Sequence, residues 1–154
     1  MPKVKFGVGG INFWGCISGS GVGILKEIDR NLTGSKYCDI LHDCYSKSLT
    51  KMGIHEAMLL EGNNSKHTLK IAAKFKAKNG INIVSNYHPY SPDLNIIENF
   101  WSFWENRVQA RKPQNLKYLR KNAFEEWEKL NLEKWYFESL INSMPNRREI
   151  DLRM

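Results

Sequence analysis

Two runs of β-branched and aromatic residues flank a short glycine-rich segment near the start of the chain. The first run covers residues 11–18 and the second covers residues 22–28, with residues 19–21 between them. Strand-forming runs that close around a short glycine-rich loop are typical of a β-hairpin. A nucleotide-binding loop is the alternative for these closely spaced glycines, but they do not open a helix inside a β-α-β unit. We therefore expect antiparallel strands within residues 4–28.

Beyond this hairpin the apolar pattern alternates between helical and strand spacing. Helical spacing begins near residue 33 and extends to about Met52, and Gly53 is in position to be the C-cap. Residues 57–60 and 81–84 are short apolar runs of the kind found in buried strands. Between those two runs, residues 66–78 again show the spacing of a helix.

The clearest helical pattern follows a loop that contains two prolines. Ser91 is in position to be the N-cap and Pro92 the first helical residue, and apolar residues then recur at helical spacing as far as Val108. Residues 116–141 carry a helical pattern throughout. The tryptophans at helical spacings in these segments are expected to pack in the core, with base stacking as the alternative: Trp101, Trp104, Trp127 and Trp135.

The order of these elements predicts a layered α/β fold with a mixed central sheet. The chain has 154 residues, which is enough for one domain with a real core, and it contains no repeat or linker-like stretch. We therefore expect a single domain over residues 1–154.

No run approaches the roughly 18 apolar residues of a membrane span, and no secretory signal is seen, so an intracellular protein without a membrane partner is expected. The three cysteines form no C-x-x-C pair, which favours reduced thiols.

The chain is basic, and part of its positive charge is concentrated in one segment. Lys and Arg number 23 against 16 Asp and Glu, giving a formal net charge of +7, which favours an anionic partner such as nucleic acid. Four lysines recur at every fourth position without an acid between them, with Lys76 beside them: Lys66, Lys70, Lys74 and Lys78. This spacing predicts a positive stripe on one face of a helix, with Leu69, Ala72, Ala73 and Phe75 facing inward. The stripe is either a ridge that contacts phosphates or an ordinary solvated face.

Three segments resemble those of mariner-type DDE transposases, within the Tc-mariner superfamily. Residues 140–148 resemble the family's closing I-x-SMPxR segment, and residues 14–18 are similar to its WGxIS hairpin. The most specific match is residues 91–101, which resemble the SPDLNPIENxW signature. The resemblance extends over about residues 4–149 and implies a ribonuclease-H-like fold with a helical C-terminal part. The residues that match the signature include Ser91, Pro92, Asp93, Asn95, Glu98, Asn99 and Trp101.

In the family that this chain resembles, three acidic residues hold two divalent ions, magnesium or manganese. One ion activates the attacking oxygen at a phosphodiester and the other stabilises the leaving oxygen, and such ions prefer oxygen ligands. Glu98 matches the third acid, so the resemblance implies a metal-binding and catalytic role, against the alternative of an exposed helix carboxylate. Asp93 lies in the same motif, but the family does not use it as a ligand, and a role at a helix N-terminus is expected.

The position of the second acid is occupied by glycine. Residues 61–67 resemble the family's QDNAxxH segment: Asn63 and His67 match, and Gly62 stands where the aspartate belongs. The 35 residues between Gly62 and Glu98 agree with the family's spacing to within one residue. Glu61 is a poor substitute because neighbouring side chains on a strand point to opposite faces. His67 either orients the site or merely begins the basic helix.

The first acid of the family lies on a strand that precedes the Trp14–Gly15 pair, and no Asp or Glu precedes Trp14 here. We therefore expect a chain truncated at its N-terminus, without that strand and without the family's helix-turn-helix DNA-binding modules. An exposed strand edge would then favour marginal folding or self-association. The resemblance implies a DNA endonuclease that acts in transposition, nuclear in a eukaryote, and this copy is expected to be inactive. The alternatives are a non-enzymatic nucleic-acid-binding protein that uses its basic face, and a relic without function.

Overall fold

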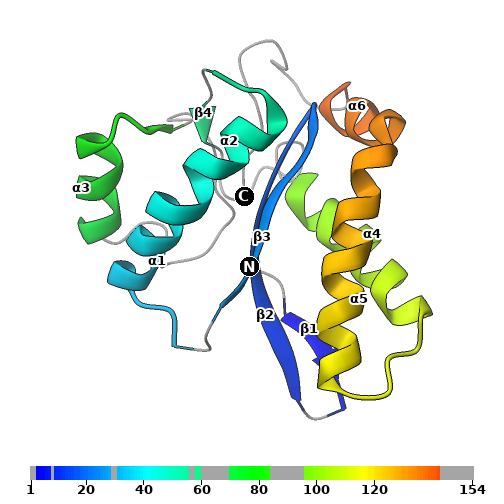
Figure 1. The fold of residues 1–154 in the computed structure, drawn as a ribbon. Coiled ribbons are helices and arrows are strands. Elements are labelled where there is room, and N and C mark those ends of the chain that lie inside the picture. The colour runs from blue at the N-terminus through cyan, green and yellow to red at the C-terminus, as the bar shows by residue number, and fades with distance from the viewer. Residues whose placement is uncertain are drawn as a thin grey trace.

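A computed structural model describes residues 3–7, 9–28, 31–55, 58–59, 70–83 and 96–142. At positions 58–59, 83, 96–98, 134 and 140–142 it describes the backbone alone. The chain folds into a mixed α/β arrangement in which helices cover both faces of a three-stranded sheet (Figure 1).

The three-stranded sheet contains the hairpin that the sequence predicts. Strands β1 (Lys3–Phe6), β2 (Gly9–Ser18) and β3 (Gly21–Ile28) are antiparallel, and β2 lies in the middle. The β2–β3 turn places Gly21 at φ +128°, a conformation that side chains other than glycine's rarely adopt. The following amide of Val22 donates to the side-chain oxygen of Asn131 at 2.9 Å, which ties the turn to the C-terminal helices. The expected hairpin is confirmed.

The two faces of β2 support two separate hydrophobic clusters. Phe13 and Ile17 belong to the cluster on the side of the C-terminal helices, whereas Trp14 and Cys16 belong to the cluster on the other side. All four side chains are at most 1% exposed. This alternation is what a strand with period two gives when both of its faces are covered. The sheet is therefore the middle layer of the fold.

One face of the sheet is covered by a nearly continuous helical segment. It consists of α1 (Gly34–Ile40), a π-helical turn (Leu41–Tyr45) and α2 (Ser46–Met52), as the pattern from residue 33 predicts. The side chain of Thr33 accepts a hydrogen bond from the amide of Lys36 at 3.2 Å and caps the N-terminus. Gly53 ends the segment at φ +70° and confirms the predicted C-cap.

A second, smaller sheet lies beyond α2 in the chain. Strands β4 (Met58–Leu59) and β5 (Asn82–Ile83) pair in parallel, and α3 (Lys70–Lys78) is described between them and packs against α1. Both strands coincide with predicted apolar runs. The sequence predicts one mixed central sheet, whereas the described strands form an antiparallel sheet and a separate parallel pair. Each of these two strands is described over two residues only, so the pairing that is described is short.

The other face of the three-stranded sheet is covered by the C-terminal helices. These are α4 (Ile96–Ala110), α5 (Leu116–Lys129), a 3-10 turn (Leu130–Leu132) and α6 (Lys134–Asn142). The predicted start of the first helix at Ser91 and Pro92 lies outside the described residues. No helix in the described part of the chain is long and apolar enough to cross a membrane.

Three of the four tryptophans at helical spacings are in the core, as predicted. Trp101 is 4% exposed, and Trp104 and Trp127 are fully buried. The prediction is wrong for Trp135, which is 62% exposed. The 3-10 turn before α6 interrupts the helical periodicity, so the spacing that places Trp127 in the core does not extend to Trp135.

Candidate functional site

The helix that carries Glu98 is held firmly in the core of the C-terminal half. Glu98 is the third residue of α4, and its side chain lies outside the described part of the structure. Directly after it, Phe100, Trp101 and Trp104 are all buried. The indole N–H of Trp104 donates to the carbonyl oxygen of Ala123 on α5 at 3.0 Å. The backbone at Glu98 is therefore positioned by the packing of the residues that follow it.

Two of the segments that carry the sequence resemblance meet in the core. The ring of Trp101, from α4, stacks on the ring of Trp127, from α5, with centroids 5.6 Å apart. Both rings lie over the backbone of Gly15 in β2, so a Cβ atom there would be 2.6 Å from Trp101 and 2.5 Å from Trp127. A glycine at position 15 is thus required for the close approach of α4 and α5 to the sheet. This contact joins the Trp14–Gly15 pair to Trp101 in the core.

Most of the other residues of the expected metal site lie outside the described residues. This applies to the position of the lost acid, Gly62, and to its neighbours. The strands before these segments are described, and β4 and β5 run parallel, so their carboxyl ends lie at the same edge of the pair. Asn99 is exposed, and its carbonyl oxygen accepts a hydrogen bond from the Tyr136 hydroxyl at 3.5 Å. The undescribed site residues are Gly62, Asn63, Lys66, His67, Ser91, Pro92, Asp93 and Asn95.

Within the described ranges, no group of three or more His, Cys, Asp or Glu side chains is placed to hold a metal ion. The three cysteines are buried thiols, in agreement with the prediction. Burial in the cluster beside α1 and α2 raises the pKa of the Cys38 and Cys44 thiols, which keeps both protonated. The described residues therefore provide a packed scaffold, and of the candidate metal ligands the structure describes only the backbone of Glu98.

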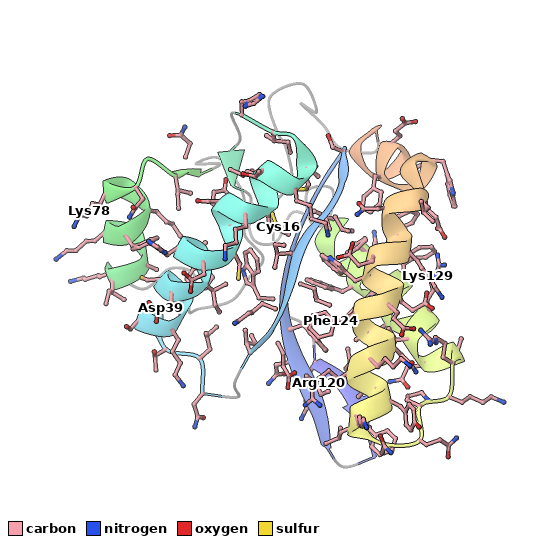
Figure 2. The ribbon with its side chains drawn as sticks, viewed as in Figure 1. Cys16, Asp39, Lys78, Arg120, Phe124 and Lys129 are labelled. Carbon is pink, nitrogen blue, oxygen red and sulfur yellow. The ribbon has the colours of Figure 1, made fainter. Side chains whose placement is uncertain are left out.

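The basic helix α3 presents lysines to solvent. Lys70, Lys74 and Lys78 are exposed, and none of them forms an ion pair with another described residue. Lys78 points outward from the end of α3, away from the sheet (Figure 2). Lys66 and His67, the other two predicted contacts, are outside the described residues. The described part of the predicted stripe is thus an exposed row of positive charges.

Lys76, which the sequence analysis placed beside that stripe, is buried rather than exposed. It is 2% exposed, and its Nζ lies 5.4 Å from the centre of the Tyr37 ring on α1. A helix turns about 100° per residue, so Lys76 lies nearly opposite Lys74 and on the same side as Ala72, which is buried against α1. Ala73, predicted to face inward, is exposed.

The sequence interpretation missed a second basic segment. No Asp or Glu occurs between Glu105 and Glu125, an interval that contains Arg107, Arg111, Lys112, Lys117, Arg120 and Lys121. This absence of acids is visible in the sequence, but the bases do not fall at one helical spacing. The structure places them around the α4–α5 connection.

Comparison with known proteins identifies transposases as relatives. Over 147 residues, 96% of this chain, it is 26% identical to the Tcb2 transposable-element transposase of Caenorhabditis briggsae, and it covers 53% of that protein. Identity to the Tcb1 transposase of the same species is 27% over 95% of the chain, covering 52% of the relative. The Tc1 transposase of Caenorhabditis elegans is 25% identical over 95% of the chain, with the same coverage of 52%. This chain is similar to Tc1-type transposases along nearly its whole length. It spans about half the length of these relatives, and no family model matches it.

Proposed function

We propose that this chain is part of a transposase of the Tc1-mariner type and that its function derives from DNA handling in transposition. The observation that carries the proposal is the similarity to Tc1-type transposases over 95–96% of the chain. A match of this extent includes the hairpin, the basic helix and the C-terminal helices rather than one short motif. The specific assignment to mariner-type enzymes with a DDE centre rests on the motifs at residues 14–18, 91–101 and 140–148.

We further propose that these residues form a ribonuclease-H-like domain. Three observations support this fold: an antiparallel three-stranded sheet, a parallel pair of strands later in the chain, and helices on both faces of the larger sheet. In such a fold the segment after β4 and the start of α4 contribute to one site. Gly62 would then occupy one position of that site and Glu98 another.

The residues present do not fit a two-ion centre. Magnesium or manganese in such a centre requires several carboxylates, because these supply hard oxygen ligands and offset the charge of the ions. Glycine has no side-chain donor, so Gly62 removes one ligand whatever other segments contribute. The centre would then lack one of its three carboxylates, and a centre short of one carboxylate holds such ions weakly. We therefore propose that this copy does not cleave DNA.

A nicking assay tests this inactivity. Supercoiled plasmid is incubated with the purified chain and either Mg²⁺ or Mn²⁺, and open-circular product is measured. The expected result is no product above that formed by the Glu98→Ala variant. Glu105→Ala, a carboxylate deletion on the same helix, is the matched control. Nicking by the native chain that Glu98→Ala abolishes and Glu105→Ala preserves would refute the proposal.

The second candidate function is non-enzymatic nucleic-acid binding through the basic face of α3. It is favoured by the exposure of Lys70, Lys74 and Lys78 and by the absence of ion pairs between them and any described acid. Binding through such a row would be independent of sequence and sensitive to salt, because each phosphate contact releases counterions. Lys66 and His67 would extend the row at its N-terminal end.

The dependence of affinity on salt tests this second function. Replacing the three lysines with Gln should lower the slope of log K against log salt by roughly 0.9 per lost duplex contact. A control variant of equal charge, with Gln at Lys5, Lys26 and Lys47, removes exposed lysines from three other elements. An unchanged slope in the α3 variant would exclude this face as the binding surface.

A further inference from the structure

The connection between α4 and α5 exposes a second group of basic residues. Residues 110–118 are all exposed except Pro113, and Lys121 follows one turn into α5 with its side chain 63% exposed. We call Lys112, Lys117 and Lys121 the basic turn. Figure 1 shows the α4–α5 connection and α3 on opposite sides of the three-stranded sheet. The basic turn is therefore a surface distinct from the α3 row.

The arginines near the basic turn are neutralised, whereas its lysines are not. Arg107 bonds Glu126 and Glu133, Arg111 bonds Glu125, and Arg120 bonds Glu27 from β3 at 2.6 Å. In the described part of the chain, Lys112 and Lys117 form no ion pair. Lys121 has only a distant contact, 3.9 Å from Glu125, which Arg111 approaches to 2.8 Å. The positive charge at the α4–α5 connection that no described acid neutralises closely is thus that of Lys112, Lys117 and Lys121.

Lys112 has a backbone conformation that its side chain does not favour. It has φ +51°, and it is the only residue other than glycine with a positive φ in the described ranges. Its amide donates to the carbonyl oxygen of Gln109 at 2.9 Å and closes the C-terminal end of α4. Glycine or asparagine is the usual residue at such a position, and another residue there is strained. A lysine at this position therefore costs stability and supplies a positive charge.

An exposed aromatic residue lies among these lysines. Tyr118 is 48% exposed, next to Lys117 and one helical turn before Lys121. Residues three apart on a helix are neighbours on its surface. Unpaired lysines beside an exposed aromatic ring match the requirements of single-stranded nucleic acid, whose phosphates bind cations and whose unpaired bases stack on rings.

We propose that the basic turn binds single-stranded DNA, with its lysines on consecutive phosphates and a base stacked on Tyr118. This proposal rests on the DNA-handling function proposed above and adds a surface and a substrate form to it. Charge complementarity selects a polyanion, and the exposed ring selects one with unpaired bases. Independently, Lys112 carries its charge at a backbone conformation, φ +51°, that costs stability.

The first test measures the affinity of the full chain for a 20-nucleotide single-stranded DNA and for the corresponding duplex at several salt concentrations. A variant with Gln at all three lysines should lower the single-strand salt slope by about 2, at roughly 0.7 per phosphate contact. Tyr118→Ala should weaken single-strand binding at least about fivefold, and Tyr118→Phe should restore it because the ring remains. The control with Gln at Lys5, Lys26 and Lys47 should retain the native slope.

Lys112→Gly separates binding from a structural role. It should raise the Tm by about 2–4 °C because glycine relieves the strain, and at the same time weaken single-strand binding. Native single-strand affinity and salt slope in the triple variant and in Tyr118→Ala would overturn this inference and leave the DNA-handling proposal intact. No DNA binding by the native chain would overturn the DNA-handling proposal and this inference with it.

Discussion

The contact between Gly15 and two tryptophan rings leads to a sharp prediction about stability. A Cβ atom at position 15 would be 2.5 Å from Trp127 and 2.6 Å from Trp101. Contacts of this length do not occur, and both rings are fixed in the core, so Gly15→Ala must displace α4 or α5 from the sheet. Forcing an extra methyl group into a packed core costs roughly 1–3 kcal/mol. For a chain of this size the Tm should fall by about 3–10 °C.

Thermal and urea unfolding measure this effect, and Gly9→Ala is the matched control. Gly9 is in the same strand, and a Cβ there would meet only the Phe6 carbonyl oxygen at 3.6 Å, an ordinary contact. Gly9→Ala should therefore leave the Tm nearly unchanged. Adding Trp101→Phe to Gly15→Ala should recover part of the loss, because the smaller ring relieves one of the two contacts. Equal stability of Gly15→Ala and Gly9→Ala would refute the close packing that joins these motifs.

Further predictions concern single side chains. Glu126→Gln should lower the free energy of unfolding by about 2 kcal/mol, because its 7%-exposed carboxylate accepts from arginine. Glu128→Gln should change this free energy by less than about 0.5 kcal/mol, because the Glu128 side chain is 60% exposed where it pairs with Lys51. Equal losses for Glu126→Gln and Glu128→Gln in urea unfolding would contradict the burial of Glu126. Gly53→Ala should cost about 1 kcal/mol, since φ is +70° and no atom lies near enough to clash; an unchanged Tm would exclude a left-handed cap. In calorimetry, Trp135→Gln should leave the free energy of unfolding unchanged, whereas Trp104→Phe should lower it by at least about 1 kcal/mol. A larger loss for Trp135→Gln than for Trp104→Phe would place Trp135 in the core.

The sequence predicts those parts of the fold that depend on local chemistry. Short glycine-rich loops and β-branched runs are sufficient for the β2–β3 hairpin, and a glycine after an amphipathic stretch is sufficient for the C-cap at Gly53. Helical periodicity likewise places Trp104 and Trp127 in the core. In each case the sequence signal lies within or directly beside the element that it predicts.

The parts that sequence analysis did not predict depend on contacts between distant segments. Lys76 is buried because α1 places Tyr37 beside it, and no pattern within residues 66–78 contains that information. Trp135 is exposed because a 3-10 turn changes the phase of the helix. The basic turn arises because acids from β3 and from later in α5 neutralise the arginines and leave the lysines. For the candidate metal site, only the position of Glu98 in α4 is described.

Divalent-ion binding tests whether Gly62 and Glu98 occupy one incomplete metal site. Mn²⁺ affinity is measured by electron paramagnetic resonance for the native chain and for Gly62→Asp, with Asn63→Asp as a control of equal charge. We expect weak binding by the native chain and by Asn63→Asp, and at least about tenfold tighter binding by Gly62→Asp, equivalent to about 1.4 kcal/mol. Adding Glu98→Gln to Gly62→Asp should abolish this gain. Full retention of the gain in that double variant, or an equal gain in Asn63→Asp, would contradict a shared site.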